Sequence, residues 1–227
     1  MSLVEDPALA LRLEWPAAAL AFLLGSVPFG LLVGRAFFKR DLRASGSGNI
    51  GAANALRTLG RKAGFAVLVL DALKGVAAVV VCGALLSHAI AGYSSAHLVA
   101  LNDDSRDFAA LQTLFAVLGH CYTPWLGFRG GKGVATYLGA VFAMSPVAGL
   151  AFVAIWLAIV LPTGIAAAGS IAAAAVAGAI VVALASGNAA LAAIGMFATV
   201  AVIVWKHRDN LARLRAGTEN RLHLLKR

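Results

Sequence analysis

Long apolar stretches alternate with short polar segments along most of the chain. Five stretches come close to or exceed the about 20 residues that a helix needs to cross a bilayer; they are 16–38, 64–86, 109–127, 164–185 and 189–206. A sixth stretch, 133–162, is apolar but is interrupted at Met144 to Pro146. The segment 49–61 is too short and too polar on one face to span, and we expect a helix there near the membrane surface. The pattern predicts an all-α integral membrane protein.

The basic residues predict which side of the membrane each loop occupies. Most of the 19 Lys and Arg residues lie in three blocks, at 35–62, 129–132 and 206–227, whereas most acidic residues lie near the N-terminus and in the loop 87–108. Cytoplasmic loops carry an excess of Lys and Arg. We therefore expect the C-terminus to be cytoplasmic and the N-terminus and the 87–108 loop to lie outside. The net charge of +9 then reflects membrane topology, and we expect no binding of nucleic acid.

The excess of Lys and Arg in cytoplasmic loops also constrains how the interrupted stretch 133–162 crosses the membrane. With the N-terminus outside, a single crossing by this stretch would leave the basic C-terminal block on the outer side. Non-helical backbone is tolerated inside a membrane where it is buried in protein. We therefore expect 133–144 and 146–162 to enter and return on one side. The expected fold has about seven helices, five of them full spans and the others short or re-entrant, in a single domain over residues 1–227.

Composition agrees with a membrane protein. The mean hydropathy is +0.86 and 13% of the residues are charged, against about a quarter in soluble domains. The first apolar stretch follows acidic residues and shows no small-residue cleavage site, so we expect a retained span and no signal peptide. Cys82 and Cys121 lie in apolar stretches without metal-ligand spacing. We interpret both as buried core residues and expect no metal site.

The first polar motif, SGSGNIGAANALRTLGRKAG (45–64), places small and basic residues between two predicted spans. Its glycines would let backbone N–H groups approach a ligand closely, and a helix that starts near Asn49 offers an N-terminal anion site. Ser47 and Asn49 are candidate polar contacts, and Arg57 supplies positive charge. The alternative is a tight surface turn whose basic side chains reach lipid headgroups.

The second motif, GHCYTPWLGFRGGKGVAT (119–136), contains a lysine among glycines. Lys132 is flanked by Gly130, Gly131 and Gly133. The motif is not a P-loop, because position 126 is Leu where that pattern needs Gly, and position 133 is neither Ser nor Thr. A glycine turn with a lysine that opens a short helix still suits a phosphate. We therefore predict phosphate binding here.

The third motif, KHRDNLARLRAGTENRL (206–222), follows the last predicted span. One interpretation is a basic amphipathic tail on anionic lipid. His207, Asn210 and Glu219 are not needed for that purpose, and His207 can titrate near neutrality. Asn210 follows it at i+3, so both side chains could face one site. The motif is therefore also a candidate part of a polar site.

Polar residues within the predicted spans have structural interpretations as well. Asp71 and Lys74 form an i,i+3 pair among apolar residues, which favours a structural ion pair. We interpret His120 as a hydrogen-bonded interface histidine. Ser170, beside Gly169, could contact a ligand headgroup, although helix packing is the alternative. Three polar motifs on one membrane face predict a phosphate-handling, lipid-linked site.

The chain contains, in order, GSVPFGLLVGR, DLRASGSGNIGAANALRTLGRKAG, DALKG, GHCYTPWLGFRGGKGVAT and HRDNLARLRAGTEN. In combination these segments resemble the bacterial acyl-phosphate:glycerol-3-phosphate acyltransferases, the PlsY family. The resemblance implies transfer of a fatty acyl group from acyl phosphate to the 1-hydroxyl of sn-glycerol 3-phosphate. The products are lysophosphatidic acid and phosphate, in the first acylation of phospholipid synthesis.

The resemblance also implies a setting and partners for the protein. It implies a seven-helix, multi-pass protein of the bacterial plasma (inner) membrane whose active site faces the cytoplasm. The partners would be acyl phosphate, glycerol 3-phosphate and the lipid bilayer. No metal, CoA or other cofactor is implied, and we expect a monomer.

By position, the resemblance carries over these residues: Ser47, Asn49, Arg57, Lys132, His207, Asn210, Glu219 and, more weakly, Ser170. Two departures stand out. Position 53 is Ala where the family usually has Thr, so a hydroxyl contact is lost or supplied elsewhere. The loop 87–108 is longer than the family needs.

The candidate catalytic residues are His207, Asn210 and Ser47. His207 could act as the base for the glycerol hydroxyl, a substrate phosphate could take the proton instead, and a covalent acyl-Ser47 route ranks last. Asn210 would orient a substrate or the carbonyl oxygen. The rival function is a small transporter of a phosphorylated solute, but the chain shows no internal repeat and its polar motifs lie on one side.

Overall fold

The computed structural model describes residues 7–91, 103–185 and 189–222. Within them the chain is helical and has no strand. Of the residues expected on the outer side, 1–6 at the N-terminus and 92–102 in the 87–108 loop lie outside the described part. The elements are α1 (Pro7–Ser26), α2 (Phe29–Phe38), η1 (Leu42–Ala44), α3 (Ala52–Leu59), α4 (Arg61–Ala91), α5 (Asp103–Cys121), η2 (Pro124–Leu126), α6 (Val134–Met144), α7 (Pro146–Thr163), α8 (Ala166–Ala183), α9 (Ala189–Lys206) and α10 (Arg208–Arg215).

Five helical segments of the described residues are long and apolar enough to cross a membrane. They are Glu14–Phe38, Arg61–Leu86, Pro146–Thr163, Ala166–Ala183 and Ala189–Lys206. The expected span 109–127 is not among them, because α5 has 19 residues and four of its first five are charged, which leaves too short an uncharged stretch. A helix surrounded by other helices does not need a fully apolar sequence, so the hydropathy pattern placed this element less accurately than the others.

The first span is broken where Pro28 interrupts it. Helix α1 ends at Ser26 and α2 begins at Phe29, since proline has no N–H to continue the helical ladder. Glycines on both sides of the break allow close backbone contacts. A Cβ at Gly25 would lie 2.0 Å from the oxygen of Ala116, and one at Gly30 would lie 1.7 Å from the oxygen of Ile50.

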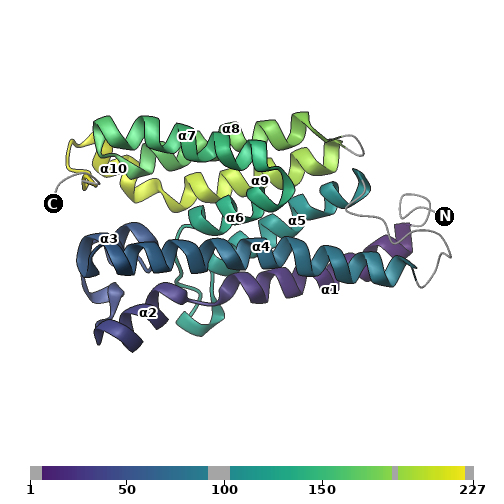
Figure 1. The fold of residues 1–227 in the computed structure, drawn as a ribbon, viewed down its shortest axis with the longest axis horizontal. Coiled ribbons are helices and arrows are strands. Elements are labelled where there is room, and N and C mark those ends of the chain that lie inside the picture. Colours follow the sequence, from purple (N-terminus) through teal and green to yellow (C-terminus); the bar gives the residue numbers. More distant parts are fainter. Residues whose placement is uncertain (1–6, 92–102, 186–188, 223–227) are drawn as a thin grey trace.

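Helices α6 and α7 form the hairpin expected from the interrupted stretch. Figure 1 shows α6 running from the end that carries α3 and α10 into the bundle, and α7 returning to that end. At the turn, the Thr113 hydroxyl in α5 lies 3.5 Å from the sulfur of Met144. At the far end of α7, the carbonyl of Gly164 accepts a hydrogen bond from the N–H of Leu222 at 2.7 Å. The hairpin therefore begins and ends at the same side of the bundle.

The main core joins this hairpin to α5, α8 and α9. Tyr137 in α6 is fully buried, and its hydroxyl donates to the oxygen of Ala174 in α8 at 2.9 Å. Small residues on α8, including Ala173, Ala177 and Gly178, are buried against neighbouring helices. This agrees with the close packing that its Ala- and Gly-rich sequence favours.

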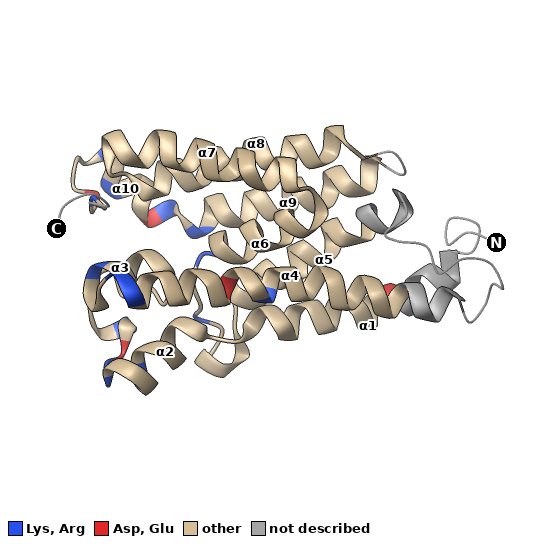
Figure 2. Cartoon of the chain, viewed as in Figure 1, with Lys and Arg blue, Asp and Glu red and all other residues tan. Residues whose placement is uncertain are grey.

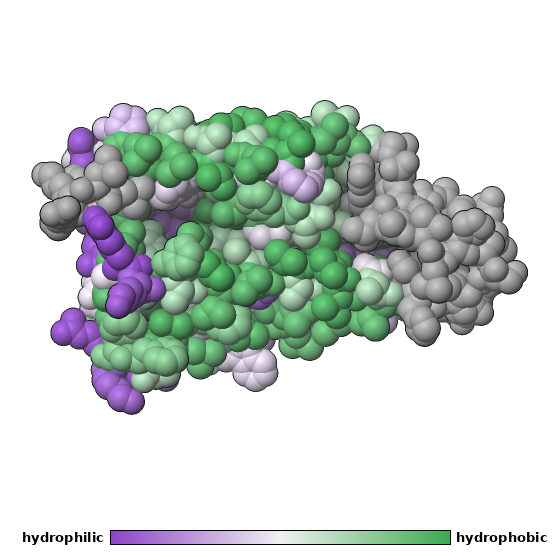
Figure 3. Space-filling model, in the orientation of Figure 1, coloured by the Kyte–Doolittle hydropathy of each residue, from purple (hydrophilic) through white to green (hydrophobic). Residues whose placement is uncertain are grey.

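Charged residues gather at one end of the bundle. Figure 2 shows most of the Lys and Arg residues around α2, α3 and α10 and few charges along the helices. Figure 3 shows apolar flanks and a hydrophilic surface at that same end. The three polar motifs therefore meet at one face, as the charge pattern predicted.

Candidate active site

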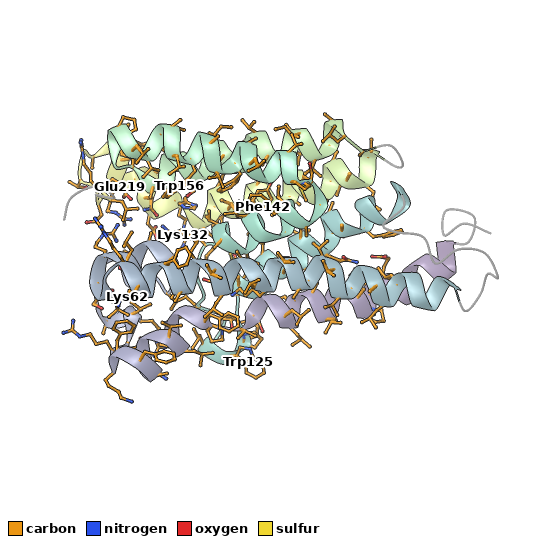
Figure 4. The ribbon with its side chains drawn as sticks, viewed as in Figure 1. Lys62, Trp125, Lys132, Phe142, Trp156 and Glu219 are labelled. Atoms are coloured by element: carbon orange, nitrogen blue, oxygen red, sulfur yellow. The ribbon has the colours of Figure 1, made fainter. Side chains whose placement is uncertain are left out.

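A cavity of about 330 Å³ opens among the three polar motifs. Its polar lining comes from the loop before α3, from α3, from the start of α6, and from α10 with the tail that follows. Asp71 in α4, His120 in α5 and Ser170 in α8 also line it. Its apolar lining comes from α4, α6 and α7. The sequence-predicted residues that line it are Ser47, Asn49, Arg57, Lys132, Gly133, Ser170, His207, Asn210 and Glu219. Figure 4 shows Lys132, Trp156 and Glu219 gathered at this end of the bundle.

Asn54 organises the first wall, and the sequence reasoning missed it. Its Nδ2 donates to the carbonyls of Leu42 and Ser45, each at 3.0 Å, and of Asn49 at 2.8 Å. Its Oδ1 accepts from the N–H of Ser47 at 2.9 Å. Asn54 is 2% exposed, so these bonds form away from water and hold the loop that presents Ser47 and Asn49. The sequence could have indicated this role, because Asn54 is a polar residue on the predicted buried face of a short helix.

Arg57 and Ala53 extend the first wall along α3. Arg57 lies in the last turn of this helix and lines the cavity. Partial burial lowers the pKa of its guanidinium, and the charge of Glu219 acts in the opposite direction. Ala53 also lines the cavity. Its side chain brings no hydroxyl to the cavity, whereas the resemblance led us to expect a threonine at this position.

Lys132 forms the second wall. Its Nζ donates a hydrogen bond to Oδ1 of Asn210, across the cavity from α10. Burial lowers the pKa of Lys132 to about 8, opposed by the attraction of Glu219 and assisted by the repulsion of Arg213. An amine with this pKa is mostly protonated at pH 7. It therefore brings a positive charge to a largely enclosed site.

The glycines beside Lys132 have different positions. Gly133 lines the cavity and begins α6 with a φ of 78°, a backbone conformation that side chains disfavour. Gly130 and Gly131 do not line the cavity. Their N–H groups donate to the carbonyls of Cys121 and His120, each at 3.1 Å. These two amides are therefore occupied by α5, and their contribution is close packing of the loop.

The third wall is a connected set of polar side chains. Nδ2 of Asn210 donates to Oε1 of Glu219 at 2.5 Å, and Nε of Arg213 donates to Oε2 of the same carboxylate at 2.9 Å. Glu219 therefore holds Asn210 by its amide nitrogen, which leaves Oδ1 to face Lys132. Arg213 was not singled out from the sequence, although it lies in the same basic segment.

His207 lies at the junction of α9 and α10 and is 3% exposed. Its Nδ1 lies 2.8 Å from the carbonyl oxygen of Ile203. A carbonyl can only accept, so Nδ1 carries the proton and Nε2 has the free lone pair. Burial, with the nearby charge of Lys132, lowers the pKa of His207 to about 4. A group with this pKa is neutral at pH 7, whereas the sequence suggested titration near neutrality.

The remaining wall is apolar and lies deeper in the bundle. Its side chains come from three helices and are Leu68, Leu138, Phe152, Val153, Trp156 and Leu157. Ser170 in α8 accepts a hydrogen bond from Nε1 of Trp156 at 3.2 Å. Its hydroxyl thus holds the indole as well as lining the cavity. The site can accommodate a molecule with an anionic end and a hydrocarbon end.

Within residues 7–91, 103–185 and 189–222, no three His, Cys, Asp or Glu side chains come together in a way that could hold a metal ion. The positive charges that face the cavity are side chains of Lys and Arg. Together with the neutral imidazole and the Asn amide, they can bind phosphate groups and orient a hydroxyl.

Comparisons with known proteins agree with this geometry. Residues 15–217 match the family model described as glycerol-3-phosphate acyltransferase. The glycerol-3-phosphate acyltransferase of Rhizobium etli is 39% identical over 214 residues, which cover 94% of each chain. That of Agrobacterium fabrum is 42% identical over 224 residues, which cover 98% of each.

The fold is similar to a solved membrane protein as well. The crystal structure of PlsY (YgiH), an integral membrane glycerol 3-phosphate acyltransferase, in its glycerol 3-phosphate form superposes with a TM-score of 0.77. The two chains are 34% identical, and the match covers 93% of this chain and 96% of the other. The lysophosphatidic acid form gives a TM-score of 0.74.

Proposed function

Because the chain belongs to the glycerol-3-phosphate acyltransferase family, we propose that it takes its acyl group from an acyl phosphate and transfers it to the 1-hydroxyl of sn-glycerol 3-phosphate. The protein is a multi-pass membrane acyltransferase whose substrate is glycerol 3-phosphate. In the proposed step, the glycerol oxygen bonds to the acyl carbonyl carbon, and the bond from that carbon to the phosphate oxygen breaks. The products are lysophosphatidic acid and phosphate.

One observation supports this function most directly: the cavity joins a cationic, hydrogen-bonding end to an apolar wall. Lys132 and Arg57 face it from separate elements, while Trp156 and Phe152 line its deeper part. An acyl phosphate has the same division into a phosphate and a hydrocarbon chain. Glycerol 3-phosphate adds a second phosphate, which explains why basic residues approach from both α3 and the loop before α6.

Catalysis in this proposal depends mainly on orientation and charge. An acyl phosphate is a mixed anhydride, so its phosphate leaves readily. Lys132 and Arg57 bind phosphate oxygens, Ser47 and Asn49 add hydrogen bonds from the loop, and Asn210 orients a substrate or the reacting carbonyl. None of these roles requires a metal ion, CoA or another cofactor.

His207 is the proposed base for the glycerol hydroxyl. Its Nδ1–H is committed to Ile203, so Nε2 is available to accept the proton. Although a pKa of about 4 makes it a weak base, two bound phosphates would raise that pKa by their negative charge. A substrate phosphate is the competing proton acceptor. An acyl-Ser47 intermediate is disfavoured, because Ser47 is held through its backbone N–H, which donates to Asn54, and no base among the described residues is hydrogen-bonded to its hydroxyl.

The cellular setting belongs to the same proposal. We place the enzyme in the bacterial plasma (inner) membrane with the cavity facing the cytoplasm, where Lys and Arg accumulate. It acts as a monomer, and its basic end serves substrates and lipid headgroups instead of nucleic acid. Family membership does not favour the rival function of a transporter.

Donor and acceptor analogues test the proposal. Purified protein in lipid is given glycerol 3-phosphate with either palmitoyl phosphate or palmitoyl-CoA, and lysophosphatidic acid is measured by mass spectrometry. We expect product from the acyl phosphate alone. Of two simplified acceptors, 3-hydroxypropyl phosphate keeps the position of the 1-hydroxyl and should react, whereas 2-hydroxypropyl phosphate should not. Product formed only from the CoA thioester would contradict the proposed donor.

A further inference from the structure

A buried charged cluster borders the cavity and has no role in the proposed chemistry; two of its members, Asp71 and His120, line the cavity wall. In α4, Nζ of Lys74 is 2.9 Å from Oδ1 of Asp71. The same Nζ donates to the carbonyl of Val27 at 2.8 Å and lies 2.8 Å from Nδ1 of His120 in α5. Lys74 is 5% exposed and His120 is 3% exposed. An ammonium can only donate hydrogen bonds, so the bonds to the Val27 carbonyl and to Nδ1 of His120, together with the ion pair to Asp71, hold it in one place.

The contact with Lys74 fixes how His120 is oriented. Because the ammonium can only donate, Nδ1 accepts, and the proton of the neutral ring lies on Nε2. Nε2 is directed at Gly131, where an added Cβ would lie 2.0 Å from it. The carbonyl of His120 also accepts the N–H of Gly131 at 3.1 Å. The ring is therefore held between Lys74 and the residue that directly precedes Lys132.

Further bonds fasten the rest of this loop to the same region. The Thr123 hydroxyl donates to the carbonyl of Ser26 at 2.7 Å, and Nε1 of Trp125 donates to the Ser26 hydroxyl at 2.9 Å. The N–H of Gly130 donates to the carbonyl of Cys121 at 3.1 Å. These contacts secure the first part of the loop and its glycine turn. At Gly131, which directly precedes Lys132, the nearest side chain is that of His120.

We propose that Lys74 and His120 are positioning residues for acyl transfer, which hold the backbone at Gly131 so that Lys132 reaches the phosphate site. The inference rests on the proposed function, because it takes Lys132 as a phosphate ligand. A displacement of about 1 Å in a positioned group can cost on the order of 10²-fold in rate. A side chain fixed by an ammonium on one side and by backbone on the other restricts such a displacement.

A pair of substitutions tests the contact between His120 and Gly131. Gly131→Ala introduces a methyl group that collides with the fixed ring, and we expect it to raise the KM of a phosphate substrate by about tenfold or more, with a smaller change in kcat. His120→Asn keeps an acceptor near the position of Nδ1 for Lys74 but removes Nε2. It should raise the KM less, and in combination with Gly131→Ala it should lower the KM below that of Gly131→Ala alone.

The measurements are initial rates of the full chain in lipid, with KM values for both substrates. Tyr137→Phe is the matched control, because it removes a buried hydrogen bond from α6 to α8 and touches neither the loop nor the cavity. Its KM values should equal those of the wild type. If the wild type transfers no acyl group, the proposed function fails. If the wild type is active but the double variant shows no recovery, the positioning role is overturned.

If Gly131→Ala does not fold, a second variant tests the same proposal. Replacing Asp71 with Asn and Lys74 with Met together removes both buried charges and avoids leaving one unpaired. His120 then loses its fixed donor, and we expect the KM of the phosphate substrate to rise while the melting temperature stays high enough for a folded assay. A folded double variant with unchanged KM values would contradict the proposal.

Discussion

At the scale of single residues, His207 and Lys132 show how burial prepares the site for charged substrates. Each has a lowered pKa, to about 4 and about 8 respectively, and burial is the largest cause in both cases. In both cases burial disfavours the positively charged form of the side chain. Anionic substrates reverse that preference, so binding itself should strengthen the proton affinity of both groups.

The role of His207 as the base predicts a large loss of turnover on its removal. General-base catalysis contributes on the order of 10²–10⁴-fold, so His207→Ala should lower kcat by about that factor. His207→Gln places an amide near the position of Nε2 and should not restore the rate, because an amide is not a base at neutral pH. A decrease in kcat of less than about tenfold in His207→Ala, with folded protein, would assign the proton to a substrate phosphate instead.

The lowered pKa of Lys132 predicts a fall in activity at alkaline pH. Below pH 8 the amine carries its proton and binds phosphate; as the pH rises through about 8 it becomes neutral. The profile of kcat/KM reports the free enzyme, so kcat/KM should fall to about half near pH 8 and decline further above it.

Lys132→Arg provides the matched control for this profile. Arginine stays protonated throughout the accessible range, so the alkaline fall should disappear in this variant even if its absolute activity is lower. An identical fall in the wild type and in Lys132→Arg would mean that another group causes it. Spontaneous hydrolysis of the acyl phosphate is subtracted at each pH.

At the scale of elements, local sequence predicted the polar segments better than it predicted their internal contacts. The interruption at Met144 to Pro146 predicted a break, because proline begins helices and disfavours the helical conformation in the residue before it. The positions of the basic blocks predicted that the chain turns back there. The glycines at 130 and 131 were expected to face a phosphate but instead bond to α5. That distinction depends on tertiary contact between α5 and the loop, which spacing alone does not contain.

Asn54 is the strongest case of a site residue that sequence reasoning missed, and it yields a prediction for the loop before α3. Asn54→Ala removes the donor to three carbonyls and the acceptor for the N–H of Ser47. An unsatisfied buried polar group costs about 1–3 kcal/mol, so we expect a lower melting temperature and faster proteolysis after Arg43.

The control for this variant is Thr58→Ala on the same helix. The Thr58 hydroxyl bonds back to the carbonyl of Asn54 at 2.8 Å, and its loss leaves the loop's own bonds in place. Acyl transfer should fall strongly in Asn54→Ala and little in Thr58→Ala. Equal effects of the two substitutions would show that α3 is merely fragile and that Asn54 has no special part in shaping the site.

At the scale of the whole molecule, we predict that all the basic segments around the cavity face the cytoplasm and that the start of α9 faces the outer side. Exposed residues at the polar end, such as Lys62 and Arg215, and an exposed residue at the start of α9, Ala190, can each be changed to Cys. The native Cys82 and Cys121 are buried and should not react. A membrane-impermeant thiol reagent added to intact cells should label Ala190→Cys alone.

The reverse labelling pattern would place the cavity on the outer side and contradict the cytoplasmic assignment. Labelling of Lys62→Cys and Arg215→Cys from opposite sides would contradict the predicted hairpin, because it would show that α6 and α7 do not return to one side. Inside-out vesicles, in which the two polar-end positions should become reactive, serve as the control for reagent access.

The most direct test of the central claim is acyl transfer by Lys132→Ala compared with Lys62→Ala. Lys132 faces the cavity, whereas Lys62 is an exposed lysine at the same end and does not line it. Purified proteins in lipid receive palmitoyl phosphate and glycerol 3-phosphate without metal or CoA, and released phosphate is followed together with lysophosphatidic acid. We expect equal amounts of both products, dependent on glycerol 3-phosphate, from the wild type and Lys62→Ala, and almost none from Lys132→Ala. Full activity in Lys132→Ala, or phosphate release without lysophosphatidic acid from the wild type, would contradict the account.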